Sequence, residues 1–75
     1  MQLSELKMGD QARITAFLKK SAAYRQQLLA MGLLPGVIVT ISHIAPLGDP
    51  IEIRVRGTAI SLRKKEAQLL QLQPL

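Results

Sequence analysis

The sequence contains no cysteine and no tryptophan, and it has only one histidine, one tyrosine and one phenylalanine. Without cysteine the chain can form no disulfide, no thiolate metal site and no thiol nucleophile, and it suits a reducing cytosol. No apolar run approaches the roughly 18–20 residues that a membrane-spanning helix needs. The first residues, 1–7, lack the apolar core of a secretory signal. These absences predict a cytoplasmic protein that does not itself cross a membrane.

Acidic residues are also scarce: five stand against ten lysines and arginines, which gives a net charge of +5 over 75 residues. This surplus suits an acidic protein surface, an anionic membrane face or nucleic acid, and its sign alone does not choose among them. The length predicts a single domain over residues 1–75, whose core supplies only about 3–5 kcal/mol of net stability. It leaves no room for a deep catalytic cleft.

Alternating apolar and polar residues predict five short strands, at 11–18, 37–44, 51–56, around 60–62 and at 69–72. In the first strand the alternation places Phe17 on the outer face beside Arg13 and Lys19. The second is apolar at most positions on both faces, so one face should meet the interior while the other lies under a helix. His43 should share the face of Val39 and Ile41, at the rim of the barrel. Residues 57–58 should turn the chain into the fourth strand, and 63–68 could form one helical turn.

A helix is predicted between the first two strands, because Ser21 can cap its N-terminus and Gly32 can end it in a left-handed conformation. Its apolar stripe runs through Tyr24, Leu28 and Met31. After the helix, a Schellman cap would place Leu33 against Leu28, and Pro35-Gly36 fits the centre of a type II turn. Five strands in so short a chain favour a small barrel, whose closure removes exposed sheet edges.

The run 24–36 (YRQQLLAMGLLPG), followed by 45–50 (APLGDP) and 51–58 (IEIRVRGT), resembles the ferrous iron transport protein A family, FeoA. The resemblance extends from 6–10 (LKMGD) to the closing leucines. It implies a mainly β fold, a small five-stranded Src-homology-3-like barrel with one α-helix inserted between strands 1 and 2. The matching residues are turn, cap and loop residues, which serve folding more than chemistry.

Catalysis finds little support, since an enzyme needs a positioned nucleophile or acid–base pair in a pocket. For metals, the weak candidates are His43, Asp49, Glu52 and Asp10, which show no ligand spacing. We therefore predict no catalytic residue, no cofactor and no tight metal site. Nucleic-acid binding is not expected either, because such barrels interleave base-stacking aromatics with basic residues and this chain offers only Phe17 and Tyr24.

A partner-binding surface is the remaining prediction. Basic residues concentrate in the C-terminal half, and the loop 45–50 holds Leu47 between proline and glycine, where it either projects as a contact or tucks over the barrel end. The candidate partner-binding residues are Leu47, Asp49, Arg54, Arg56, Arg63, Lys64 and Lys65. Apolar helix and loop residues permit a homo-oligomer without requiring one.

The function comes from the resemblance, since the residues alone do not indicate it. The resemblance implies an accessory protein of bacterial ferrous iron uptake, which docks on the membrane transporter FeoB from the cytoplasmic side and is needed for its activity. Two alternatives stay open. One is the C-terminal barrel module of a metal-dependent repressor, against which we weigh a chain that begins at Met1 without a DNA-reading helix. The other is a basic barrel associated with RNA or the ribosome, which would hold nucleic acid at physiological salt.

Overall fold

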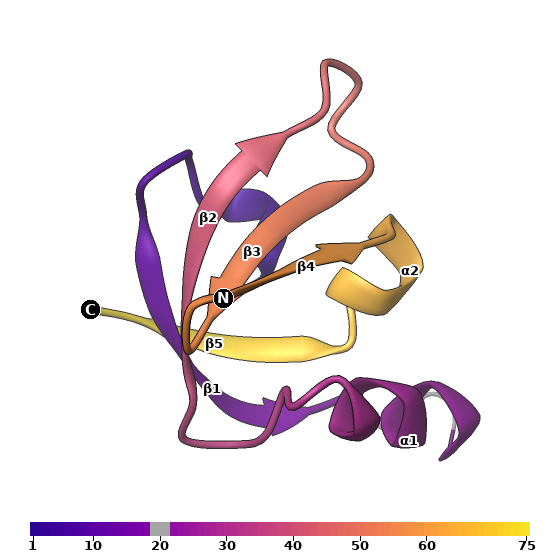
Figure 1. The fold of residues 1–75 in the computed structure, drawn as a ribbon. Helices are drawn as coiled ribbons and strands as arrows, with labels where there is room; N and C mark the ends of the chain where they lie inside the picture. The colour runs from indigo at the N-terminus through magenta and orange to yellow at the C-terminus, as the bar shows by residue number, and fades with distance from the viewer. Residues whose placement is uncertain (19–21) are drawn as a thin grey trace.

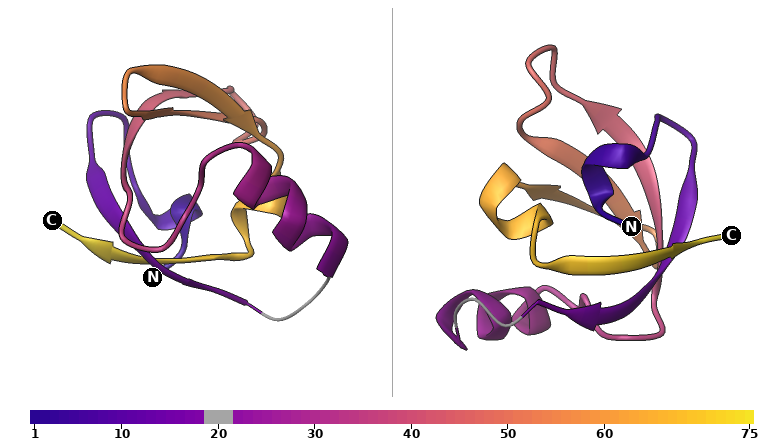
Figure 2. Two further views of the ribbon diagram at one scale, coloured as in Figure 1. Left: turned by 60° about the horizontal axis from the view of Figure 1, so that its bottom comes forward. Right: turned by 180° about the vertical axis from the view of Figure 1, so that it is seen from behind.

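The structure is a computed structural model that describes residues 1–18 and 22–75. Its five antiparallel strands form one sheet in the order β4-β3-β2-β1-β5, which curls into a small barrel (Figures 1 and 2). The strands are β1 (Gln11–Phe17), β2 (Ile38–Ile44), β3 (Ile51–Val55), β4 (Thr58–Leu62) and β5 (Leu70–Pro74). The described helices are a 3-10 turn η1 (Leu3–Glu5), α1 (Ala22–Ala30) and α2 (Lys64–Ala67). The predicted fold class, with one helix between strands 1 and 2, is confirmed.

The barrel interior is filled by aliphatic side chains from every strand and from η1 and α1. The 3-10 turn η1, which the sequence pattern did not predict, buries Leu3 and lies against β5, where the backbone N–H of Leu72 donates to Met1 O at 2.9 Å. The largest fully buried side chains are Leu3, Ile14, Leu28, Leu33, Val39, Ile41, Ile53, Leu62 and Leu70. Burial of such side chains is the main force that holds the fold.

The C-terminal end of α1 is the predicted Schellman cap. The backbone N–H of Leu33 donates to Leu28 O at 3.0 Å and that of Gly32 donates to Leu29 O at 3.0 Å, with Gly32 at φ +89°. Leu28 and Leu33 are both fully buried. The cap therefore ties the helix to the core by the contact that the sequence predicts. The expected N-cap, Ser21, lies outside the described residues.

The type II turn at Pro35-Gly36 is also present, since the N–H of Val37 donates to Leu34 O at 3.1 Å and Gly36 has φ +95°. The strand after it begins one residue later than predicted, at Ile38. The prediction that the helix covers the outer face of this strand is wrong. Ile38 on that face remains 39% exposed, and α1 lies instead beside α2 at one end of the barrel (Figure 2).

A β-bulge at Thr15 overturns the predicted alternation in β1. In the pairing with β5, Ile14 opposes Leu72 and Ala16 opposes Gln71, so Thr15 is the extra residue. Its hydroxyl donates to Gln71 O at 3.2 Å. Because an extra residue reverses the alternation beyond it, Ala16 is exposed and Phe17 turns inward to pack against the core. The prediction of an outward Phe17 is therefore wrong.

A second bulge, at Ser42 in β2, has the same effect. Ile41 opposes Ile53 and His43 opposes Glu52, which leaves Ser42 unpaired in the ladder. The Ser42 hydroxyl lies 3.1 Å from Glu52 O and 2.9 Å from Glu52 Oε1. His43, predicted to share the inner face with Val39 and Ile41, is consequently exposed on the outer face beside Glu52.

The β3–β4 hairpin closes through a turn one residue earlier than predicted. Val55 pairs with Thr58, and the two residues between them, Arg56 and Gly57, have φ of +53° and +82°. Positive φ at both central positions is the signature of a type I′ turn, whose twist matches that of the strands. Arg56 therefore sits in a turn and not on the third strand.

Candidate docking surface

The loop from Ala45 to Pro50 joins β2 to β3 and projects from one end of the barrel (Figure 1). Backbone bonds hold its shape: the N–H of Gly48 donates to Ala45 O at 2.7 Å, and the N–H of Ala45 donates to Pro50 O at 3.1 Å. Leu47 at its tip is 95% exposed. Of the two positions open to this leucine from the sequence, the structure adopts the projecting one.

Asp49 connects this loop to α2. Its Oδ1 accepts from the backbone N–H of Lys64 at 3.0 Å, at the first residue of the helix. Within α2, Glu66 Oε1 accepts from the N–H of Arg63 at 2.9 Å, and the Glu66 side chain is only 8% exposed. Both carboxylates thus bind free amides at the start of a helix, where negative charge is favourable. As a result, the loop and α2 form one continuous surface.

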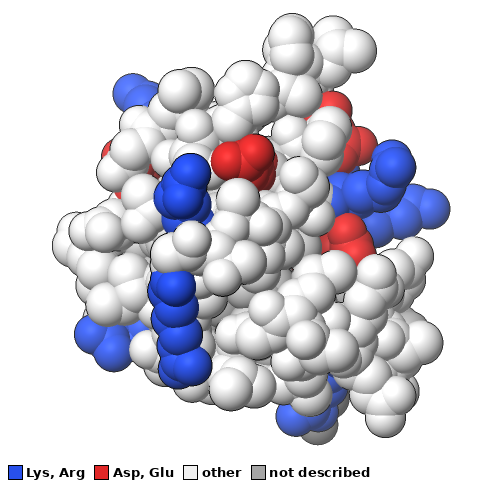
Figure 3. Space-filling view, viewed as in Figure 1, with Lys and Arg blue, Asp and Glu red and all other residues white. Residues whose placement is uncertain are grey.

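The basic side chains of this surface are Arg63, Lys64 and Lys65, all exposed. Among the residues that the structure describes, none provides these three side chains with a hydrogen-bond or ion-pair partner. Lys and Arg atoms gather on the face over α2, with acidic atoms beside them (Figure 3). The arrangement leaves cationic groups free to meet an anionic partner.

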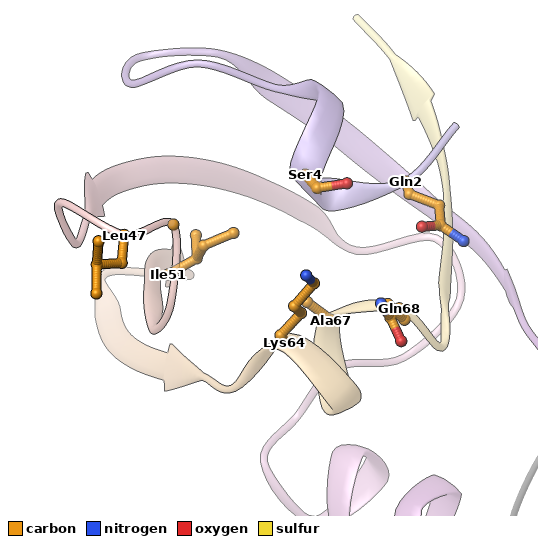
Figure 4. A pocket seen from close by; sticks show the side chains of 8 residues that line it. Gln2, Ser4, Leu47, Ile51, Lys64, Ala67 and Gln68 are labelled. Atoms are coloured by element: carbon orange, nitrogen blue, oxygen red, sulfur yellow. The ribbon is translucent and has the colours of Figure 1, made fainter.

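Two hollows flank α2, and Lys64 contributes to both. The first lies between η1, the loop and α2, and Figure 4 shows the side chains around it. Its lining residues are Gln2, Ser4, Leu47, Gly48, Ile51, Lys64, Ala67 and Gln68. The second lies between α1 and α2 and is lined by Tyr24, Gln27, Met31, Asp49, Pro50, Ser61, Arg63, Lys64, Lys65 and Glu66. We call the second hollow the α1–α2 groove.

The structure brings five of the seven predicted partner-binding residues together at this end of the barrel: Leu47, Asp49, Arg63, Lys64 and Lys65. Arg54 and Arg56 do not join them. Arg54 pairs with Ala59 next to the hairpin turn that contains Arg56, at the other end of β3 from the loop. The predicted residues therefore form two separate sites, one centred on α2 and one on the hairpin turn.

Sequence reasoning missed the α1 wall of the groove. Tyr24 and Met31 were assigned only to the buried stripe, yet both line the groove, and Tyr24 is 37% exposed. Together with Gln27 they occupy positions i, i+3 and i+7, which share one helix face. That spacing indicates a shared face of α1, but nothing in the sequence indicates that α2 lies opposite this face and completes a groove.

The four weak metal candidates are scattered. His43 and Glu52 oppose each other on the outer face, Asp49 is engaged by Lys64, and Asp10 Oδ2 accepts from the N–H of Lys7 at 2.8 Å. Over residues 1–18 and 22–75, no three His, Asp or Glu side chains are grouped as metal ligands would be. The absence of a tight metal site stays a prediction.

In the same described ranges, no helix has the length and apolar character that crossing a membrane would require. The architecture and its surface define the class: a small barrel of the Src-homology-3 kind, with a helix inserted between its first two strands.

The chain belongs to the FeoA family, because the model of the FeoA domain matches residues 1–74. The resemblance read from the turn and loop residues is thereby confirmed, and with it the assignment to an iron-transport family. The chain is also 36% identical, over 97% of its length, to an Fe(2+) transport protein A/Fe(2+) transporter FeoB fusion protein of Porphyromonas gingivalis, of which it spans 8%.

Solved structures agree with this assignment. Iron(II) transport protein A from Clostridium thermocellum is 37% identical, with a TM-score of 0.91 over all of this chain and 46% of that one. FeoA from Stenotrophomonas maltophilia, solved in complex with zinc and described as an SH3 domain protein, is 28% identical. Its TM-score is 0.83, over 97% of this chain and 89% of that one. The chain thus spans less than half of two of these relatives.

Proposed function

We propose that residues 1–75 act as one domain that serves ferrous iron uptake by docking on a membrane ferrous iron transporter of the FeoB kind. Docking takes place at the cytoplasmic face of the membrane, and transport depends on it. The observation that carries the proposal is the P. gingivalis protein, in which a relative of this chain and a FeoB transporter form a single polypeptide. Fusion keeps two partners at a high effective concentration, which is useful when they work in contact.

The docking surface we propose is the loop 45–50 together with α2. A leucine that is 95% exposed provides an apolar contact, and α2 and the residue before it add three exposed cations, of which Lys64 lines the same hollow as the leucine. Hot spots of protein interfaces combine such an apolar centre with a charged rim. The Asp49–Lys64 bond pre-orders the loop against α2, which reduces the conformational entropy lost on binding.

The role we propose is non-enzymatic. Among the described residues the one histidine is exposed on a strand, and Asp49 and Glu66, the carboxylates nearest the groove, are engaged with backbone amides. None of these groups forms the nucleophile–base pair that group transfer or hydrolysis needs. Any nucleotide or ion chemistry then belongs to the transporter.

The test is retention of a FeoB-type transporter by the immobilised chain from a detergent extract of membranes at near-physiological salt. Wild type should retain the transporter, whereas Leu47→Asp combined with Lys65→Glu should reduce retention at least about tenfold. Arg54→Glu combined with Arg56→Gln, at the hairpin end, is the matched control and should retain it fully. Both double variants should keep the wild-type circular dichroism spectrum.

Three results would contradict the proposal: no retention by wild type, equal loss in the hairpin control, or retention of RNA in place of the transporter through high salt. Ferrous iron uptake by cells that lack the chain gives the second readout. Wild type should restore uptake and the Leu47→Asp, Lys65→Glu variant should not.

A further inference from the structure

We infer that the α1–α2 groove receives an acidic segment of the transporter that inserts one apolar side chain between the two helices. This inference rests on the proposed function, and it adds the chemistry of the partner segment and the place where it binds. It is carried by the charge of the groove, by its apolar wall and by the way the groove's own carboxylates are used.

The groove has two unlike walls. On one side α1 presents Tyr24, Gln27 and Met31, and Met31 is partly buried against the hydrophobic core. On the other side α2 and the residue before it present basic side chains. A segment lying between the walls would thus meet an apolar surface on one side and cations on the other.

The charges that line the groove determine the charge of the segment that can bind there. The groove is lined by three cations, Arg63, Lys64 and Lys65, and by two carboxylates, Asp49 and Glu66. Both carboxylates accept hydrogen bonds from backbone amides, whereas the cations have no side-chain partner within the described parts of the chain. An incoming carboxylate can therefore bind these cations without displacing an internal bond, and the net charge of +5 attracts it from a distance.

The apolar wall of the groove determines the second feature of the partner segment, its apolar anchor. Met31 and Pro50 line the groove, and a flexible thioether adapts its shape to different apolar side chains. One leucine-sized side chain buried there would add a favourable apolar transfer contribution, which short acidic segments lack on their own. We therefore expect an acidic segment with an apolar anchor to bind more tightly than a purely acidic one.

A peptide fits these observations better than nucleic acid or a lipid surface. Single-stranded nucleic acid stacks on several aromatic side chains, and the groove contains one, Tyr24. A lipid surface binds protruding apolar groups, whereas Met31 is set within a hollow and packed against the core. Binding to either therefore becomes an outcome of the test.

The experiment is fluorescence anisotropy with a short fluorescein-labelled peptide of Asp and Glu around one central Leu, titrated with the intact chain at two salt concentrations. Three comparison peptides are used: one with Lys in place of every acid, one with Ser in place of Leu, and one with the same residues in D configuration. The acidic Leu peptide should bind most tightly, and its affinity should fall as salt rises. The Lys peptide should not bind.

Variants then locate the site. Lys64→Glu with Lys65→Glu should weaken binding of the acidic Leu peptide at least about tenfold, whereas Arg54→Glu with Arg56→Glu, the same change in charge at the hairpin end, should change it less than about twofold. Met31→Gln should weaken the Leu peptide about fivefold and leave the Ser peptide unchanged, because only the Leu peptide uses that contact. Amide chemical-shift changes should cluster on α1 and α2.

The inference is wrong if the two charge-reversed variants lose affinity equally, if the Leu and Ser peptides bind alike, or if the shift changes map to the hollow between η1 and the loop. It is also wrong if vesicles of phosphatidylserine and phosphatidylcholine, or a single-stranded RNA, bind at the groove while the acidic peptides do not bind. If wild type retains the transporter but binds none of the peptides, the proposed function stands and this inference falls. If the peptides bind but no transporter is retained, the proposed function fails by itself.

Discussion

The two connections that flank β3 solve the same topological problem in different ways. Between β3 and β4 the chain uses only Arg56 and Gly57, the shortest common hairpin turn, both with positive φ. Between β2 and β3 it uses the longer loop 45–50, with Leu47 almost fully exposed at its tip and Asp49 bound to α2. Both connections join antiparallel neighbours, so closing the sheet does not require the longer one.

This difference shows how function can be separated from folding in so small a barrel. A long loop costs little in closure entropy, but an exposed leucine gains nothing for the fold. The backbone bonds within the loop and its bond to α2 indicate that its shape is maintained. We therefore expect changes in the loop to affect binding, and changes in the hairpin turn to affect stability.

The largest expected effect comes from making the two connections alike. Replacing Pro46–Asp49 by Asn-Gly gives β2 and β3 a short turn and removes Leu47 and Asp49. The chain should still fold, with a free energy of unfolding within about 1–2 kcal/mol of wild type, because no fully buried side chain is lost. Retention of the transporter should fall roughly a hundredfold, or about 2–3 kcal/mol. Urea unfolding and the retention assay measure the two quantities separately.

The reverse case is Gly57→Val. A β-branched residue at φ +82° is strained even though open space surrounds the position, so we expect a loss of about 1–2 kcal/mol in the free energy of unfolding. Transporter retention should not change at a temperature where the variant is folded. A stable Gly57→Val variant that no longer retains the transporter would disprove the division between the two connections.

A third change, Asp49→Ala, removes the hydrogen bond between the loop and α2 and leaves the hydrophobic core intact. We expect it to cost about 1 kcal/mol of stability, since an exposed side-chain bond and a favourable charge at a helix start are both lost. Binding should weaken by a similar factor, because the loop is less ordered before contact. Asp49→Asn, which keeps an acceptor oxygen, should recover most of the loss in both assays.

The smallest effect is expected from Arg56→Asn. Asparagine tolerates a positive φ better than arginine, so the turn should gain about 0.5 kcal/mol. The melting temperature should rise slightly while retention stays at the wild-type level. A drop in retention would instead show that Arg56 contacts the partner.

How far the sequence predicts this molecule depends on the range of the interactions concerned. The Gly32 cap, the contact of Leu33 with Leu28 and the Pro35-Gly36 turn are correct, because each is determined by residues within a few positions of one another. The sequence does not decide whether Leu47 projects or tucks over the barrel end, since its exposure depends on what the folded barrel places nearby. The α1–α2 groove was not predicted, because its walls come from segments that meet only after the sheet has closed.

The predictions for Phe17 and His43 fail for one shared reason. Period-two reasoning assumes an unbroken ladder, and each of these residues follows a bulge, at Thr15 and at Ser42. Bulges arise where a strand must bend to close a barrel, which is a property of the whole sheet. The local sign, in retrospect, is that each extra residue carries a hydroxyl within hydrogen-bonding distance of a carbonyl on the neighbouring strand.

The bulges at Thr15 and Ser42 determine which side chains of β1 and β2 face the core. A strand sorts its side chains by odd and even position, and one inserted residue exchanges the two classes for everything downstream. If Thr15 entered the ladder opposite Gln71, Phe17 would thus move into solvent without being altered itself, and if Ser42 paired with Glu52, His43 would turn into the core. In a domain this small, the position of a bulge along its strand therefore decides which of the following side chains are exposed, just as the choice of residues does.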